Sequence, residues 1–158
     1  MSAKETITAL RTTLQAGADL TYASDSGYED ADVEELVQLN KFPFFNITCE
    51  GWETAPAPNM NIKHLERTIY DMLIQFATRA MKKTLAKQGD SGRPGIYDFA
   101  DDIWDTIRAD PTLGRVINGY LPGSSVLVDV VEVQGNNERY FIGAGEMRIK
   151  LYKDIGRA

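Results

Sequence analysis

The chain has 158 residues, a formal net charge of −6 and one cysteine, Cys49. A chain of this length can fold as one domain with a real core, and 43% hydrophobic with 25% charged residues is the balance of an ordinary globular protein. One cysteine excludes a disulfide framework and a cysteine zinc site, and the acidic balance argues against direct binding of nucleic acid, which depends on dense positive charge.

No apolar run approaches the roughly 20 residues that cross a bilayer. The N-terminus also lacks the apolar core of a signal peptide. We therefore expect a protein that is made in the cytoplasm and does not enter a membrane.

The N-terminal segment predicts a short amphipathic helix over residues 3–16. Ser2 and Glu5 have the spacing of a capping box, in which each side chain satisfies a free amide of the first turn. Apolar residues then recur at helical spacing. They are Ile7, Leu10 and Leu14. Gly17 is a plausible end of this helix.

An acidic stretch follows, and we expect an exposed loop over about residues 20–35. Its carboxylates belong to Asp25, Glu29, Asp30, Asp32, Glu34 and Glu35. A calcium loop needs ligands at fixed alternate positions, a central glycine and a closing glutamate. Here Gly27 comes too early and the acids do not alternate from the start. A solvated loop explains the stretch better, so we predict no metal site.

Residues 44–50 predict a strand, because apolar and polar side chains alternate from Phe44 onward. Residues from about 51 to 63 contain glycine, tryptophan and proline, and they predict a long loop. Residues 64–88 carry apolar side chains that fit one face of a helix and one face of a strand equally well. Periodicity therefore leaves that segment open.

A turn-rich segment at residues 89–95 must interrupt any regular element. Residues 96–109 then predict an amphipathic helix that ends at Asp110, because the residue before a proline disfavours the α region. Four aspartates lie largely opposite its apolar face, namely Asp98, Asp101, Asp102 and Asp105. Acidic residues near a helix N-terminus interact favourably with the helix dipole. We interpret them as a solvated or partner-facing stripe.

The C-terminal third predicts a β-hairpin with strands at 125–134 and 140–152. Its turn, at residues 135–137, consists of types that tolerate positive φ. In the second strand apolar and charged residues alternate, so one face packs on a core and the other presents charges. Gly143 and Gly145 indicate a bulge or a close approach of backbones.

The residues that catalysis needs do not form a recognisable set. His64 is the only histidine, and nothing near it in the sequence completes a Ser–His–Asp or Cys–His arrangement. Cys49 occupies an inward strand position, as an ordinary buried thiol does. The glycines of residues 89–95 lack the ending of a phosphate-binding loop. We predict a protein that is not an enzyme and needs no cofactor.

Several features together resemble one protein family, over roughly residues 3–153. They are Ala9-Leu10 in a helix, the strand Phe44-Phe45-Asn46-Ile47-Thr48-Cys49-Glu50-Gly51, a variable loop, a strand around Ile69 to Ala77, a helix opened by Gly95-Ile96-Tyr97-Asp98 and ended by Asp110-Pro111-Thr112-Leu113-Gly114, and a closing hairpin. This order is similar to that of tail terminator (tail completion) proteins of long-tailed bacteriophages. The resemblance implies that residues 66–79 form a strand. It implies one α+β domain, with a mainly antiparallel sheet of about four strands packed against two or three helices, among them those at 3–16 and 96–109.

The resemblance also implies a function that is geometric rather than chemical. Such a protein is a virion component of the tail and neck, assembled in the host cytoplasm. It forms a hexameric ring that caps the tail tube, stops its polymerisation and offers a surface to a neck or head-completion protein. Candidate contact residues are Trp52, Arg93, Glu146, Arg148 and Lys150. Trp52 is an aromatic anchor in the segment expected to reach the tube or a neighbouring subunit, or it packs over its own sheet.

Two alternatives stay open at this point. The first is another phage neck or head–tail connector ring, which differs only in its partner. The second is a small hydrolase or ligand-binding domain that uses His64 and the acidic residues.

Overall fold

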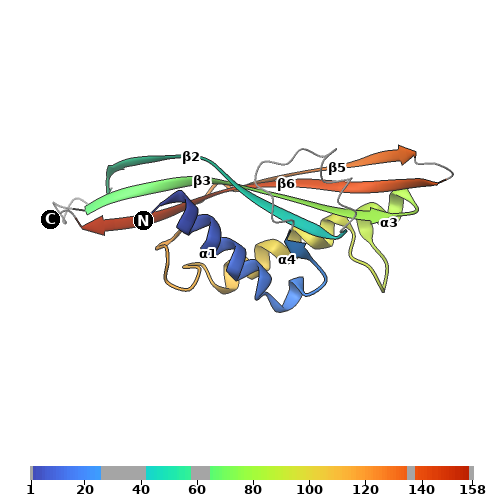
Figure 1. Ribbon diagram of the computed structural model, residues 1–158, viewed down its shortest axis with the longest axis horizontal. Helices are drawn as coiled ribbons and strands as arrows, with labels where there is room; N and C mark the ends of the chain where they lie inside the picture. Colours follow the sequence, from blue (N-terminus) through green and yellow to red (C-terminus); the bar gives the residue numbers. More distant parts are fainter. Residues whose placement is uncertain (1, 26–41, 58–64, 135–137, 157–158) are drawn as a thin grey trace.

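The computed structural model describes residues 2–25, 42–57, 65–134 and 138–156. Its elements are α1 (Ala3–Gln15), the 3-10 helix η1 (Ala18–Leu20), β1 (Ser24–Asp25), β2 (Phe44–Pro56), β3 (Leu65–Ala80), α3 (Lys83–Gln88), α4 (Ile96–Ala109), β4 (Gly119–Tyr120), β5 (Ser125–Gln134) and β6 (Arg139–Gly156). The helices lie on one side of a single sheet (Figure 1). The α+β class expected from the sequence is confirmed.

The sheet has the order β1-β2-β3-β6-β4, and β5 also pairs with β6. All described pairings are antiparallel except the short one between β1 and β2. The long strands β2, β3, β5 and β6 are the predicted ones. The two-residue strands β1 and β4 were not predicted, because such short segments carry no periodicity.

Within residues 64–88, which periodicity left open, Leu65–Ala80 form the strand β3, as the resemblance implied for residues 66–79, whereas Lys83–Gln88 form the helix α3. β3 pairs with β2 on one side and with β6 on the other, so it is the centre of the sheet. The prediction of a loop from residue 51 is wrong for residues 51–56, which continue β2. A bulge at Gly51 shifts the register, and pairing with residues 66–71 of β3 then carries the strand on to Pro56. Residues 58–63 of the predicted loop, and most of the acidic stretch, lie outside the described residues.

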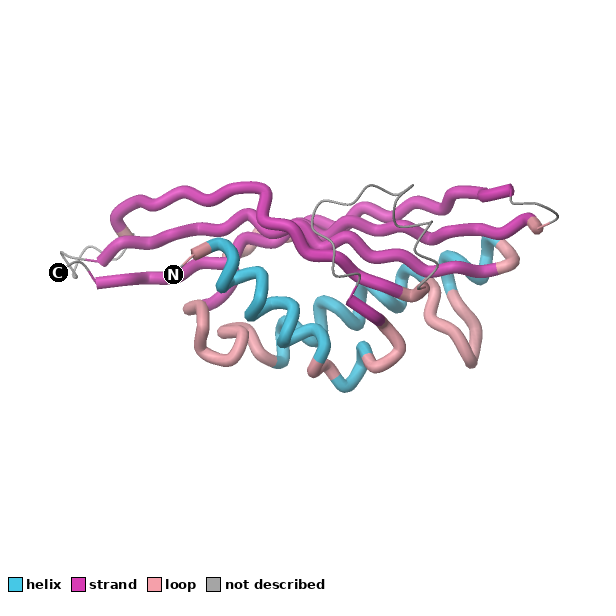
Figure 2. Tube along the Cα trace, in the orientation of Figure 1, coloured by secondary structure: helices cyan, strands magenta, loops and turns pink. Residues whose placement is uncertain are grey.

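One face of the sheet is covered by α1 and α4, with α3 near the far end (Figure 2). The predicted capping box of α1 is confirmed, since the Ser2 hydroxyl accepts from the Glu5 amide at 3.3 Å and the Glu5 carboxylate accepts from the Ser2 amide at 3.2 Å. The predicted apolar face of α4 is buried against the sheet. The central residues of this core are Leu10, Leu14, Phe45, Ile47, Met72, Ile74, Phe76, Ile96, Phe99, Ile103, Met147, Ile149 and Leu151.

Two of the four aspartates of α4 have structural roles. The Asp98 carboxylate accepts from the amide of Gly95 and so caps the helix at 3.4 Å. Asp102 accepts a hydrogen bond of 2.6 Å from the Tyr22 hydroxyl, and this bond ties the segment after α1 to α4. Burial, followed by this hydrogen bond, raises the pKa of Tyr22, and burial also raises the pKa of Asp102.

The two glycines of β6 mark close approaches and not a bulge, because the register of β3 and β6 is continuous past both. A Cβ at Gly143 would lie 2.8 Å from the carbonyl oxygen of Ala86, in α3. A Cβ at Gly145 would meet the ring of Phe76. The absence of side chains at these positions lets α3 and the Phe76 ring pack directly on the strand.

β3 and β6 are 16 and 18 residues long, far beyond the usual strand of about 5–6 residues. They therefore extend past the helices at the end of the molecule that carries the C-terminus (Figure 1). This projection, made of residues 52–56, 65–69 and 152–156, is called the arm below. Among the described residues, no helix is both long and apolar enough to cross a membrane.

Candidate assembly surface

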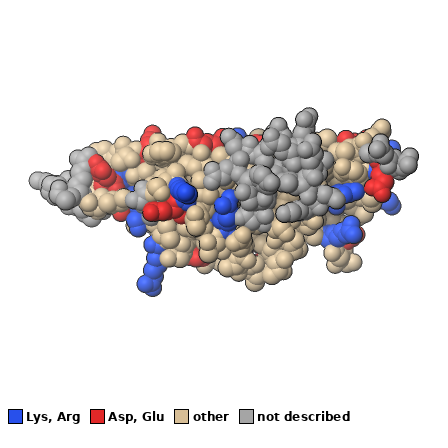
Figure 3. All heavy atoms as spheres, in the orientation of Figure 1, with Lys and Arg blue, Asp and Glu red and all other residues tan. Residues whose placement is uncertain are grey.

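The face of the sheet opposite the helices carries charged residues in its middle. The Arg148 guanidinium bonds Glu50 at 3.1 Å and Glu146 at 3.2 Å, and the Lys150 ammonium lies 3.1 Å from Asp71. Glu146, Arg148 and Lys150, predicted as contact residues, thus lie together and are neutralised by neighbours within the same subunit. Solvent-exposed pairs of this kind contribute little stability. Charges of both signs are interspersed along the visible face of the molecule (Figure 3).

The same face of the arm holds a more buried ion pair. Arg67 of β3 bonds Asp154 of β6 through two nitrogens, at 2.8 and 2.9 Å. The guanidinium also lies 4.1 Å from the ring centre of Tyr152. Such a fork geometry is the strong form of a salt bridge, so it holds the strands of the arm together where no helix covers them.

Beyond the charged middle, the face of the sheet opposite the helices becomes apolar, and its described residues form a groove. One row across four strands runs from Asp129 through Ala144 and Ala77 to Phe44. The two alanines form the floor. The apolar walls are Phe42 and Phe44 on one side and Leu127, Val131 and Ile142 on the other. Its volume of about 240 Å³ lies below the roughly 300–1,000 Å³ of small-molecule sites.

β5 forms one edge of the sheet and is exposed along most of its length. Leu127 is 64% exposed on the face opposite the helices, and Val126 is 45% exposed on the side of the helices. Val128 and Val131 are exposed as well, one on each face. Exposed apolar patches of this kind mark interaction sites, and an edge strand also offers unpaired backbone groups to a partner strand.

Trp52 lies on the arm, on the side of the sheet that carries the helices. The register places it opposite Tyr70, whose ring is buried on the side of the helices, but Trp52 itself is 62% exposed. Its role as a contact residue remains a prediction.

Arg93 lies apart from the other predicted contact residues. It follows α3 in the turn at 89–95, where Asp90 accepts hydrogen bonds from the amides of Gly92 and Arg93. Its side chain borders a hollow with Ala80, at the end of β3. Ala80 is ten residues from Tyr70, the partner of Trp52, or roughly 33 Å along a strand. The predicted contact residues therefore do not form one site.

The side chains considered for catalysis give no support to the alternative of a small hydrolase. Burial raises the pKa of the Cys49 thiol, which disfavours the reactive thiolate. His64 lies outside the described residues. Within the described ranges, no three His, Cys, Asp or Glu side chains gather as the ligands of a metal would.

The apolar residues of β5 were missed as a surface by reasoning from the sequence, which assigned them only to a hairpin strand. A signal was present, because residues 126–131 are apolar at nearly every position instead of alternating. Such runs are typical of strands buried on both faces. In this protein such a strand lies at an edge of the sheet, and most of its side chains are exposed.

The comparisons with known proteins do not assign the chain to a family. No protein-family model matches it, and no curated protein matches it in sequence.

Proposed function

We propose that the protein is a structural subunit that assembles head to tail into a ring, and that this ring caps the tail tube of a long-tailed phage. The cap would end tube polymerisation and offer its other face to the neck or head. The observation that carries the proposal is β5, an edge strand whose apolar side chains are exposed on both faces.

A second edge of the described sheet, formed by β2, supports a head-to-tail arrangement. In the described part of the chain, β1 pairs with only the first two residues of β2, so residues 46–56 of β2 have a partner on one side alone. β2 and β5 lie at opposite edges of the sheet. Different surfaces at opposite edges suit heterologous contacts, which close into a ring when the rotation between subunits closes.

The tail assignment rests on the resemblance in the order of elements. The order helix, strand, strand, helix and hairpin that it implies is the order found, which supports the proposal without singling out the tail tube as partner. A related neck ring would have the same subunit architecture and differ in what it binds.

Electron microscopy of the purified protein, alone and mixed with tail tubes, tests the proposal. We expect six-membered rings, or a cap at one end of each tube. Val126→Asp should abolish both, because it places a charge in the apolar edge. Met81→Asp should abolish neither, since Met81 is 58% exposed at the end of β3, away from that edge. Rings that do not bind tail tubes would favour a ring at another position of the neck. A monomer that binds no tube would refute the proposal.

A further inference from the structure

The geometry points to a specific contact between copies of this chain: the arm of one subunit lies over the apolar groove of the next, with Trp52 in the groove and Lys153 against Asp129. The inference rests on the proposed function, because it supplies the head-to-tail contact that a ring requires. It goes further by naming the two surfaces and the residues that meet.

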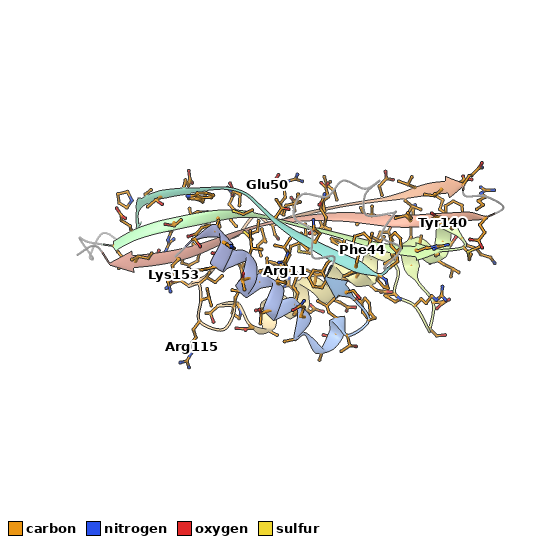
Figure 4. The ribbon with its side chains drawn as sticks, in the orientation of Figure 1. Arg11, Phe44, Glu50, Arg115, Tyr140 and Lys153 are labelled. Atoms are coloured by element: carbon orange, nitrogen blue, oxygen red, sulfur yellow. The ribbon has the colours of Figure 1, made fainter. Side chains whose placement is uncertain are left out.

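The underside of the arm, meaning its face on the side of the helices, carries the inserting groups. Trp52 lies opposite Tyr70, and Lys153 lies opposite Thr68, two residues further along β3. Both therefore point to the side of the helices, as does the exposed side chain of Ile155. Figure 4 shows Lys153 below the sheet and Glu50 above it. Glu66, opposite Ile155, points to the same side. Among the described residues, this underside therefore carries apolar groups, one cation and one carboxylate, and no helix covers it (Figure 1).

The groove matches these groups in size and chemistry. Its floor of small residues and its apolar walls, among them Phe44 and Leu127, form a slot of about 240 Å³. That volume suits one or two side chains rather than a metabolite. Tryptophan is among the residue types enriched at the energetic anchors of protein interfaces, which sit in well-packed, desolvated pockets.

Charge complementarity fixes the position of the arm in the groove. Asp129 stands at the end of the groove next to β5, and Lys153 is the cation of the arm's underside. Neither side chain forms an ion pair with another residue that the structure describes. Lys153 is two residues along and two strands across from Trp52, or roughly 12 Å. Asp129 and Phe44 are three strands apart, or roughly 14 Å. If the Trp52 indole lies between them, Lys153 is within reach of the Asp129 carboxylate.

The directions of the two surfaces allow the contact without a reversal of either subunit. The arm's underside faces the way the helices face, and the groove opens on the opposite side of the sheet. Two subunits can therefore overlap with the arm of one above the groove of the other, and a rotation of about 60° between neighbours closes a six-membered ring. On β3, Tyr70 pairs with Trp52 of the arm and Ala77 lies on the floor of the groove. The two residues are seven positions apart, or roughly 23 Å. Each subunit thus presents one arm and one groove, as a heterologous contact requires.

Self-association of variants, measured by analytical ultracentrifugation, tests the anchor and the charge pair. Trp52→Ala should weaken association roughly 30-fold or more, as expected for a central anchor, while Met81→Ala should leave it unchanged. Asp129→Lys and Lys153→Asp should each weaken association, and the chain that carries both should recover it, because the opposite charges meet again across the contact. All four positions are at least partly exposed, and circular dichroism checks that each variant folds.

Cross-linking of concentrated protein locates the contact directly. Cys49→Ser removes the native thiol and keeps the hydrogen bond that its side chain donates to the Gly51 carbonyl. In that background, Lys153→Cys and Asp129→Cys in one chain should give a ladder of oligomers with a short bismaleimide. A mixture of two chains, each with one of the two cysteines, should stop at dimers, and neither chain alone should cross-link.

The outcomes separate this inference from the proposed function. If both the wild type and the Trp52→Ala variant form rings and no cross-linked ladder appears, the inferred contact is wrong but the proposed ring is supported. Dimers of the Lys153→Cys chain alone would overturn it as well, because they show a symmetric contact. Absence of both rings and ladder, with tail tubes present, would overturn the contact and the ring together.

Discussion

The packing of Phe76 against Gly145 offers a quantitative test of the core. A Cβ at Gly145 would meet three carbons of the Phe76 ring, the farthest of them at 2.9 Å. Ordinary carbon contacts lie at about 3.5–4.0 Å, so the ring would have to move by roughly 1 Å. It cannot move freely, because it packs on Phe99 with ring centres 5.2 Å apart at the middle of the core.

Gly145→Ala is therefore expected to lower the free energy of unfolding by about 1–3 kcal/mol, the usual range for overpacking. A domain of this length loses about 2–4 °C of Tm for each kcal/mol, so the fall in Tm should be roughly 2–12 °C. Gly51→Ala is the matched control in the same sheet, since a Cβ there meets nothing within 4 Å. We expect it to be neutral or to stabilise by about 0.4–1 kcal/mol, because it restricts the unfolded chain.

The assay is thermal and urea unfolding followed by circular dichroism. A double-mutant cycle adds a second check, because Phe76→Leu makes room for the added methyl group. The cost of the two changes together should fall short of the sum of their single costs by at least about 0.5 kcal/mol. Equal Tm values for Gly145→Ala and Gly51→Ala, or strictly additive costs, would refute the packing argument.

Three further predictions concern polar groups. Burial raises the pKa of Asp102, so the ionised carboxylate destabilises the folded protein above the pKa of the unfolded carboxyl. Asp102→Asn should therefore raise Tm at neutral pH. The gain should disappear near pH 4, about where an unfolded aspartate takes up its proton. A lower Tm at neutral pH would contradict this. The Arg67 and Asp154 side chains are only 20% and 15% exposed, so Arg67→Ala should lower the free energy of urea unfolding by about 1.5–3 kcal/mol. Lys150→Ala, at an exposed ion pair, should change it by no more than about 0.5 kcal/mol. Equal costs would contradict the difference between the buried and the exposed pair. Alkylation of Cys49 by iodoacetamide should be much slower in the folded protein than in urea at the same pH, because burial raises the pKa of the thiol, and equal rates would contradict that assignment.

Much of the fold could be predicted because its signals are local. The capping box at Ser2 and Glu5, the end of α4 before Pro111 and the alternation along β6 each depend on residues a few positions apart. Periodicity likewise identified which side of β6 faces the core. These features follow from backbone geometry and from the burial of apolar side chains, which act over one or two turns or one strand.

Residues 51–56 and the segment 65–80 lay beyond such reasoning. Glycine and proline predict a loop at the former, but pairing with β3 keeps it in the sheet. Apolar spacing fits both a helix and a strand at the latter, and neighbours on both sides make it a strand. In both cases long-range hydrogen bonds to a partner strand overrode or decided the local preference.

The candidate surfaces depend most on tertiary structure. The row from Asp129 to Phe44 joins residues as far apart in the chain as Phe44 and Ala144, and only the strand order brings them into one groove. The direction of Trp52 is set by the bulge at Gly51. The amino-acid sequence alone indicates which residues are apolar or charged. Their exposure and their neighbours are set by packing, because a side chain is buried only where another element covers it.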